Sequence, residues 1–277
     1  MNFSNILLKW YTFNKRELPW RNTNNPYFIW LSEIILQQTR VEQGLPYYLK
    51  FIKLFPTISD LANAKEDKVL KLWQGLGYYS RARNLHYSAK YIVKYYDGKF
   101  PKQYQNILNL KGVGTYTAAA IASFSFGLAY AVVDGNVIRV LSRFFGIQIP
   151  FDTALGKKKY QQMAQDLLSK NYPAQNNQAI MDFGAIQCTP KQPICSSCPF
   201  ISNCVAYNTN TIKELPVKLK KSKIMSKITT LSSSVLEQKK KETIEAQSLR
   251  KSVPFRDIKI IDEKSIEFNG HKLKMTK

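Results

Sequence analysis

The sequence lacks any run of about 20 apolar residues, the length that a membrane-spanning helix needs. Its first 15 residues contain no apolar run before a small-residue cleavage site, so we also expect no secretion signal. Acidic residues are scarce, because 19 Asp and Glu stand against 41 Lys and Arg, which gives a formal net charge of +22. This excess suits a polyanionic partner, either nucleic acid or an acidic membrane face.

Cysteine is absent from the first 187 residues, and all four cysteines lie within the next 17: Cys188, Cys195, Cys198 and Cys204. Such clustering excludes disulfides spread over the fold and indicates metal ligands. The spacing C-x6-C-x2-C-x5-C has one close pair, whereas zinc sites usually have two. It therefore favours a [4Fe-4S] cluster over zinc, with a structural role in shaping this loop.

Runs of alternating β-branched residues are also scarce before Cys188, which disfavours a sheet. Apolar residues recur there at spacings of three and four, as in Val69, Leu72 and Trp73. Proline and glycine divide the segment into about ten expected helices with short connections. The sequence therefore predicts an all-α fold in this part of the chain.

The character of the chain changes after Cys204. Residues 211–227 are rich in lysine and predict a basic linker. Residues 228–277 alternate weakly, as at Ile258 and Ile260, and predict a short tail with a few strands, of uncertain α+β character. We expect this tail to bury little core on its own.

A glycine-containing segment, residues 110–117, predicts a hairpin between two helices. Gly112 and Gly114 allow a sharp turn with exposed N–H groups, and Thr115 or Thr117 can cap the following helix. Such a helix start can hold a phosphate without reading base sequence. The alternative is an ordinary helix–turn–helix corner, but the net charge and the cysteine loop favour phosphate binding.

Glu33 lies in an apolar stretch, residues 30–40, that predicts a helix. On that helix Glu33, Gln37 and Arg40 share one face. A carboxyl group among apolar neighbours has a raised pKa and can donate a proton near neutrality. The alternative is a half-exposed Glu33 paired with Arg40.

Asp134 is followed by a helical pattern that ends at Gly146. Asp-Gly between apolar residues can also form a strand hairpin, but Val137 and Leu141 keep a helical period. We therefore place Asp134 at a helix start, where the helix dipole favours the ionised carboxylate. Two acids with pKa values pushed apart are the pattern expected of glycosidic-bond chemistry.

Taken together, these motifs resemble the MutY family of adenine DNA glycosylases over about residues 3–217. The residues that carry the resemblance are Leu18 to Arg21, Trp30 to Thr39, Gly75 to Asn84, Gly112 to Gly114, Val133 to Val137 and the four cysteines. The resemblance implies a helix-hairpin-helix glycosylase fold. It comprises a six-helix barrel domain over 21–130 and an iron–sulfur helical domain built from 1–20 and 131–210.

The resemblance implies hydrolysis of the N-glycosidic bond of adenine mispaired with 8-oxoguanine or guanine in duplex DNA. Glu33 would protonate adenine at N7, and Asp134 would stabilise the oxocarbenium sugar. Implied DNA contacts are Gln38, Thr39, Tyr78, Gly112, Gly114, Thr115, Tyr116 and Thr117. The implied base pocket is Arg21, Leu36, Asn136 and Gln178. A cytoplasmic bacterial monomer, associated with the nucleoid through DNA and with no membrane partner, is expected.

Three alternatives share parts of this pattern. Endonuclease III, a glycosylase and AP lyase, carries a lysine at the position of Tyr116, which predicts that this chain lacks efficient strand cleavage. A catalytically silent iron–sulfur DNA-binding protein and a thymine-mismatch glycosylase are the others. The chain differs from the family in its last part, because residues 228–277 are fewer than the roughly one hundred residues of the family's C-terminal domain. We expect a truncated or degenerate domain, with His271 exposed.

Overall fold

The computed structural model describes residues 3–219, 258–262, 265–268 and 271–274. The chain divides into two compact units, Met1–Leu219 and Lys220–Lys277. The helices of the first unit are α1 Phe3–Asn14, η1 Pro19–Arg21, α2 Pro26–Ile35, α3 Val41–Leu54, α4 Ile58–Asn63, α5 Glu66–Leu72, α6 Ser80–Tyr96, α7 Tyr104–Leu108, α8 Thr115–Phe126, α9 Gly135–Phe145, α10 Ala154–Leu167, α11 Pro173–Asp182, η2 Phe183–Gln187, η3 Cys195–Ser197, η4 Ile201–Asn203 and α12 Val205–Asn208. The all-α prediction is confirmed for residues 3–219.

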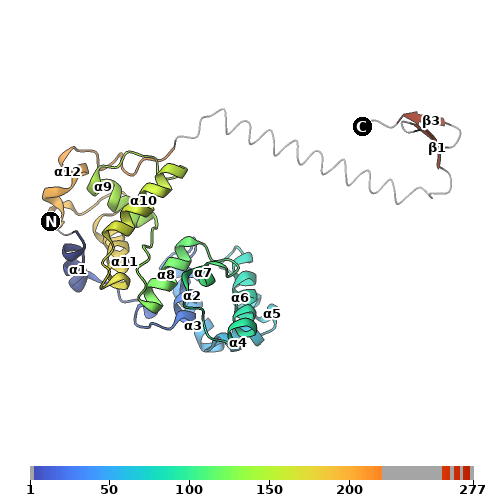
Figure 1. The fold of residues 1–277 in the computed structure, drawn as a ribbon, viewed down its shortest axis with the longest axis horizontal. Helices are drawn as coiled ribbons and strands as arrows, with labels where there is room; N and C mark the ends of the chain where they lie inside the picture. The colour runs from blue at the N-terminus through green and yellow to red at the C-terminus, as the bar shows by residue number, and fades with distance from the viewer. Residues whose placement is uncertain (1–2, 220–257, 263–264, 269–270, 275–277) are drawn as a thin grey trace. The chain divides into compact units, whose positions relative to one another are not determined.

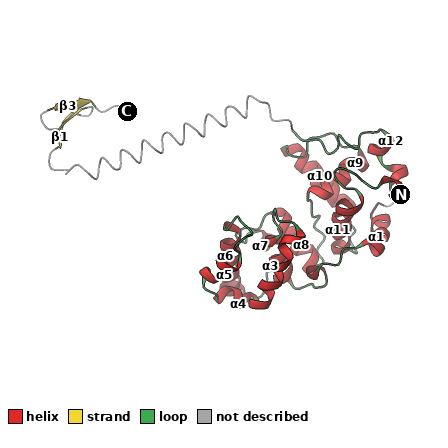
Figure 2. Ribbon diagram, turned by 180° about the vertical axis from the view of Figure 1, so that it is seen from behind, coloured by secondary structure: helices red, strands yellow, loops and turns green. Residues whose placement is uncertain are grey.

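The helices of the first unit form two groups around two large hydrophobic cores (Figure 1), and a small third cluster contains Ala119, Ala120 and Val132. One core is built from α2 to α8 and contains the buried rings of Trp30 and Trp73. The other combines α1 with α9 to α11 and is closed by Phe200. Figure 2 shows α1 beside α11 from the opposite side, so the start of the chain packs against a helix far away in sequence.

Local capping explains where several helices begin. The Asn25 side chain accepts the Tyr27 N–H at 2.9 Å, and Pro26 occupies the first position of α2. Thr57 and Asp60 form a reciprocal capping box at the start of α4. The predicted end of α9 is confirmed, because Gly146 adopts the left-handed conformation there.

The second unit contains three described strands, β1 Ile258–Asp262, β2 Ser265–Phe268 and β3 His271–Lys274. They form an antiparallel sheet in the order β1-β2-β3, in which Ile260 pairs with Ile266 and Ile266 with Leu273. The few strands predicted for the tail are therefore present. The rest of the predicted tail and linker from 220 onward lies outside the described residues.

The predicted start of the basic linker differs from the structure. Residues 211–219 belong to the first unit, because Leu215 is buried and the Phe151 N–H donates to the Val217 carbonyl at 3.1 Å. The many lysines of residues 211–227 predicted a linker, although the apolar side chain of Leu215 packs into the first unit. Within the described residues, no helix combines the length and apolar character needed to cross a membrane.

Candidate active site

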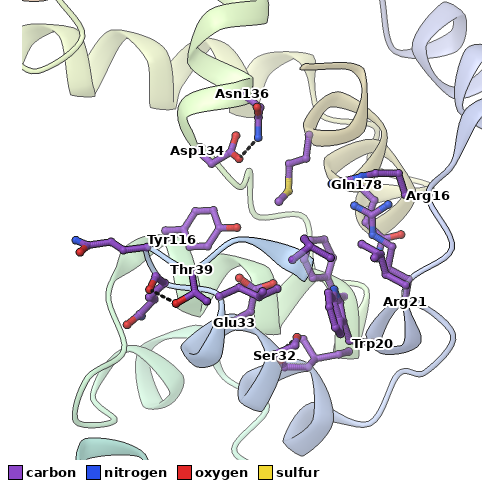
Figure 3. Close-up of a pocket in the computed structure, with 18 of the residues that line it drawn as sticks. Arg16, Trp20, Arg21, Ser32, Glu33, Thr39, Tyr116, Asp134, Asn136 and Gln178 are labelled. Carbon is purple, nitrogen blue, oxygen red and sulfur yellow. Dashed lines mark hydrogen bonds between the residues drawn. The ribbon is translucent and has the colours of Figure 1, made fainter. Parts of the chain in front are cut away.

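Both predicted acids, Glu33 and Asp134, line the same cavity of about 630 Å³ in the first unit. This volume lies within the range of pockets that enclose small organic ligands. The walls come from η1, α2, the turn after α2, the start of α8, the start of α9 and α11 (Figure 3). Among the predicted site residues, the lining includes Arg21, Glu33, Leu36, Gln38, Thr39, Tyr116, Asp134, Asn136 and Gln178.

Glu33 lies on α2, whose neighbouring residues Ile34 and Ile35 are buried in the first core. Burial raises the pKa of the Glu33 carboxyl to about 7, and the negative charge of Asp134 also raises it. A hydrogen bond with Tyr116 and the positive charge of Arg21 act in the opposite direction. The predicted proton donor is therefore poised near neutrality.

Asp134 is the N-cap of α9, as predicted. Its carboxylate accepts the Val137 N–H at 2.8 Å and the Asn136 side-chain amide at 2.7 Å. These hydrogen bonds and the charge of Arg139 lower the pKa of Asp134, but burial outweighs them and raises it. The helix start favours the ionised form as predicted, through the Val137 N–H, but the sequence did not reveal the opposing effect of burial.

Tyr116 interacts electrostatically with both acids. Figure 3 shows its ring between Glu33 and Asp134. Burial raises the pKa of the Tyr116 hydroxyl well above its ordinary value, and the negative charges of both carboxylates raise it further. Tyr116 therefore stays protonated and can donate to Glu33.

Arg139 connects Asp134 to the cysteine loop. Its guanidinium donates to the Asn136 side-chain oxygen at 2.7 Å, the Gly184 carbonyl at 2.7 Å and the Cys188 carbonyl at 2.8 Å. Gly184 lies in the π-helix η2, and a Cβ there would come within 2.6 Å of the Asn136 Cβ. Only glycine permits this approach, which brings η2 against the start of α9.

Arg21 forms a buried ion pair with Asp182 of α11. The carboxylate of Asp182 is fully buried and also accepts the Arg16 side chain at 2.6 Å. The pKa of Asp182 is lowered by these two arginines, against the opposing effect of burial. On the same wall, Gln178 accepts the Tyr11 hydroxyl at 3.0 Å. Arg21 therefore braces the cavity wall, as part of an ion pair that no local sequence pattern indicates.

The predicted helical face of Glu33, Gln37 and Arg40 is not formed. Helix α2 ends at Ile35, and Gln38 has a φ of 56°, which is not helical. Arg40 is the N-cap of the next helix, α3. Gln37 still lines the cavity, whereas Arg40 does not. The apolar pattern did not reveal this turn.

The predicted hairpin is formed between α7 and α8. Gly112 has a φ of 84°, and a Cβ at this position would lie 2.8 Å from the Asn84 Cβ. Gly112, Gly114 and Thr115 are exposed. The predicted threonine cap is wrong, because Gly114 is the N-cap and makes no side-chain bond. Thr117 is buried, so its side chain is not available to DNA as predicted.

Tyr78 lies outside the cavity lining, and its side chain is 68% exposed. It follows Gly75 and Gly77, and all three residues have positive φ angles. An exposed aromatic ring on such a tight turn is available to a partner, as the predicted DNA contact requires.

The four cysteines are partly buried and free of disulfides. Burial raises the pKa of Cys198 to about 11, and the charges of Cys188, Cys204 and Cys195 raise it further, so the four thiols lie within electrostatic range of one another. Arg143 donates to the Thr189 carbonyl at 2.7 Å and lies 3.6 Å from the Cys188 sulfur. Among the described residues, no three Cys, His, Asp or Glu side chains are arranged to hold a metal ion.

The comparisons with known proteins place these features in a family. Residues 31–169 match the HhH-GPD superfamily base excision DNA repair proteins. The chain is 42% identical over 230 residues to the adenine DNA glycosylase of Buchnera aphidicola subsp. Schizaphis graminum, covering 81% of this chain and 65% of that protein. It is 43% identical over 213 residues to the human adenine DNA glycosylase, covering 74% of this chain and 39% of that protein.

Solved structures support the same assignment. A thermostable thymine-DNA glycosylase superposes with a TM-score of 0.70 at 31% identity, covering 75% of this chain and 95% of that one. Endonuclease III in a non-covalent DNA complex gives a TM-score of 0.64 at 20% identity, covering 75% and 94%, and shows a shared fold. The chain spans about 65% of the length of the Buchnera relative. The chain belongs to the HhH-GPD superfamily of base excision DNA repair proteins.

Proposed function

We propose that the protein is a monofunctional adenine DNA glycosylase that removes adenine mispaired with 8-oxoguanine or guanine in duplex DNA. The observation that supports this most directly is that Glu33 and Asp134, about 100 residues apart in sequence, line one cavity. The sequence identity of about 40% to adenine DNA glycosylases supports adenine as the base that is removed.

In the proposed reaction, the flipped adenine enters the cavity and Glu33 supplies its proton to the base. The pKa of about 7 keeps a large fraction of Glu33 protonated at neutral pH. Two neighbouring carboxyl groups tend to share one proton. The hydrogen bonds to Asp134 favour its anion, so the proton resides on Glu33.

Protonation makes the base a better leaving group, and the C–N bond to the sugar breaks. The electron pair of that bond leaves with adenine, and positive charge develops on the sugar. The Asp134 carboxylate then stabilises this charge, and water adds to the sugar and loses one proton to solvent. Arg139 and Asn136 hold Asp134 in place during this step.

The other assignments follow from position and chemistry. The exposed backbone of Gly112 and Gly114 would bind a phosphate, with Gln38, Thr39, Tyr78, Thr115 and Tyr116 near the DNA. The core of α2 to α8 would belong to the barrel domain, and the core of α1 and α9 to α11 would belong to the iron–sulfur domain. Cys188, Cys195, Cys198 and Cys204 would hold a [4Fe-4S] cluster, whose iron would bind their sulfurs as thiolates and stabilise their loop.

Strand cleavage through a Schiff base requires an amine in the cavity. Within the described residues, no lysine lines the cavity that holds both acids. Lys111, at the other end of the hairpin, is exposed and lies over the Tyr87 ring at 4.7 Å. We therefore favour base removal without efficient lyase activity over the endonuclease III alternative.

The test uses the full chain and duplexes with adenine opposite 8-oxoguanine, guanine, cytosine or thymine, followed by alkali to cleave abasic sites. Excision opposite 8-oxoguanine and guanine is expected, together with little enzyme trapped on DNA by borohydride. Excision of thymine from a thymine:guanine mismatch, with adenine left intact, would replace this proposal with the thymine alternative. Strong trapping would favour the lyase alternative.

A further inference from the structure

Two exposed turns each contain a residue with a left-handed backbone conformation, which residues other than glycine rarely adopt. Gln38 has a φ of 56° and Tyr78 a φ of 46°. Gln38 lines the cavity, and the Tyr78 ring is largely exposed. Left-handed residues with side chains persist only where the surroundings determine them, and they concentrate at functional sites.

The guanidinium of Arg81 contacts both turns. One amino nitrogen donates to the Gln37 carbonyl at 2.6 Å and the Ile35 carbonyl at 3.0 Å. The other lies 3.0 Å from the Leu76 carbonyl and 3.3 Å from the Gly77 carbonyl. The residues immediately before Gln38 and Tyr78 are therefore bound to one side chain.

Arginine suits this position for three reasons. Its planar fork serves two separate groups of acceptors, which a lysine ammonium on one stem cannot span equally. Its positive charge lies at the C-terminal end of α2, where helix carbonyls lack partners. Its face also covers the rings of Trp73 at 5.1 Å and Tyr78 at 5.9 Å.

We propose that Arg81 is a positioning residue that couples the Gln38 and Tyr78 turns, so that both side chains meet the DNA together as the target base leaves the duplex. Removing a base from the stack leaves a gap that inserted side chains can fill. A rigid pair fills it with less loss of conformational freedom than two independent side chains. The inference rests on the proposed base-excision function.

The decisive variant is Arg81→Lys, with Arg83→Lys as the matched control. Arg83 lies on the same helix, is exposed and pairs only weakly with Glu66 at 3.5 Å. The assay uses the full chain and a duplex with fluorescent 2-aminopurine opposite 8-oxoguanine to follow extrusion. Single-turnover excision of adenine is measured in parallel, at saturating enzyme.

We expect Arg81→Lys to lower both extrusion and excision by about tenfold or more, because small misplacements near a reacting group have effects of this size. Arg83→Lys should stay within about twofold of the wild type. The pH midpoint of excision should not move in Arg81→Lys, since Glu33 is intact. Normal extrusion by Arg81→Lys, in a protein whose wild type excises adenine, would overturn the inference. Extrusion by the wild type without excision would instead overturn the proposed function.

Hydrogen exchange provides a second test, which uses the wild type and therefore does not depend on the folding of a variant. In the wild type, DNA binding should slow the backbone amides of residues 37–39 and 77–79 together, because Arg81 joins the two turns. Protection of one turn without the other would contradict the coupling. In a folded Arg81→Lys variant, both turns should exchange faster while residues 118–122 of α8 remain unchanged.

Discussion

The two walls of the cavity place their carboxyl groups in contrasting surroundings. On the α2 wall, Glu33 follows the buried Leu31 and Ser32 and relies on Tyr116 for a hydrogen bond. On the α9 wall, the Asp134 carboxylate accepts hydrogen bonds from Val137 and Asn136, and the charge of Arg139 is nearby. Burial raises the pKa of both acids, so in the proposed reaction the larger number of polar partners assigns the anion to Asp134 and the proton to Glu33.

The contrast also shows how the two cores contribute to one site. Glu33 is fixed by the core of α2 to α8, and Asp134 by the core that includes α9 and α11. Tyr116 packs against a small third cluster that contains Ala119, Ala120 and Val132, and the charges of both acids raise its pKa. The proposed chemistry therefore needs residues attached to both of these cores.

The sharpest way to break this contrast is Glu33→Gln. Glutamine keeps the size of the side chain but cannot donate a carboxylic proton, so excision should fall by about 10²–10⁴-fold. Single-turnover excision measures the effect, and a gel-shift titration should show retained DNA affinity. Glu42→Gln, an exposed neighbour on α3, is the matched control. An unaltered rate in Glu33→Gln would remove Glu33 from the mechanism.

The opposite wall is tested through Arg139→Gln. The substitution removes the contacts that link Asn136 to the Gly184 and Cys188 carbonyls, so Asp134 should lose its exact placement. We expect excision to fall by about 10- to 100-fold while the pH midpoint set by Glu33 changes little. Arg83→Gln controls for loss of a surface charge. A large shift of that midpoint would show that the two walls are not separable.

The pH dependence of excision sharpens the assignment of the proton to Glu33. A general acid acts in its protonated form, and the pKa of Glu33 is about 7. The single-turnover rate should therefore be level below neutrality and decrease by about five- to tenfold from pH 7 to pH 8. A rate that rises with pH over this interval would assign the titrating group to a base.

Local patterns of apolar spacing, glycine and capping residues predicted the helices, the hairpin and the positions of Glu33 on α2 and of Asp134 at the start of α9. The catalytic roles of these two acids stay predictions. The turn at Gln38 was missed because its left-handed backbone has no glycine to mark it. The Arg21 pair with Asp182 was missed because the partners lie 161 positions apart. Long-range polar contacts leave no periodic signal.

The smallest expected effect is on stability, and it should have the opposite sign to the effect on activity. The pKa of Glu33 is raised from an ordinary value of 4.5 to about 7 in the folded protein. The folded state therefore keeps its full stability below pH 4.5 and loses part of it as the pH rises through 7. At pH 8 the wild type must hold a partly desolvated carboxylate, whereas Glu33→Gln carries no charge. Urea unfolding should show Glu33→Gln more stable than the wild type by about 1–2 kcal/mol at pH 8, after allowance for partial solvent screening, with a smaller difference at pH 5. A variant equally stable at both values would mean that water solvates the Glu33 carboxylate, and the contrast between the two walls would then rest on Asp134 alone.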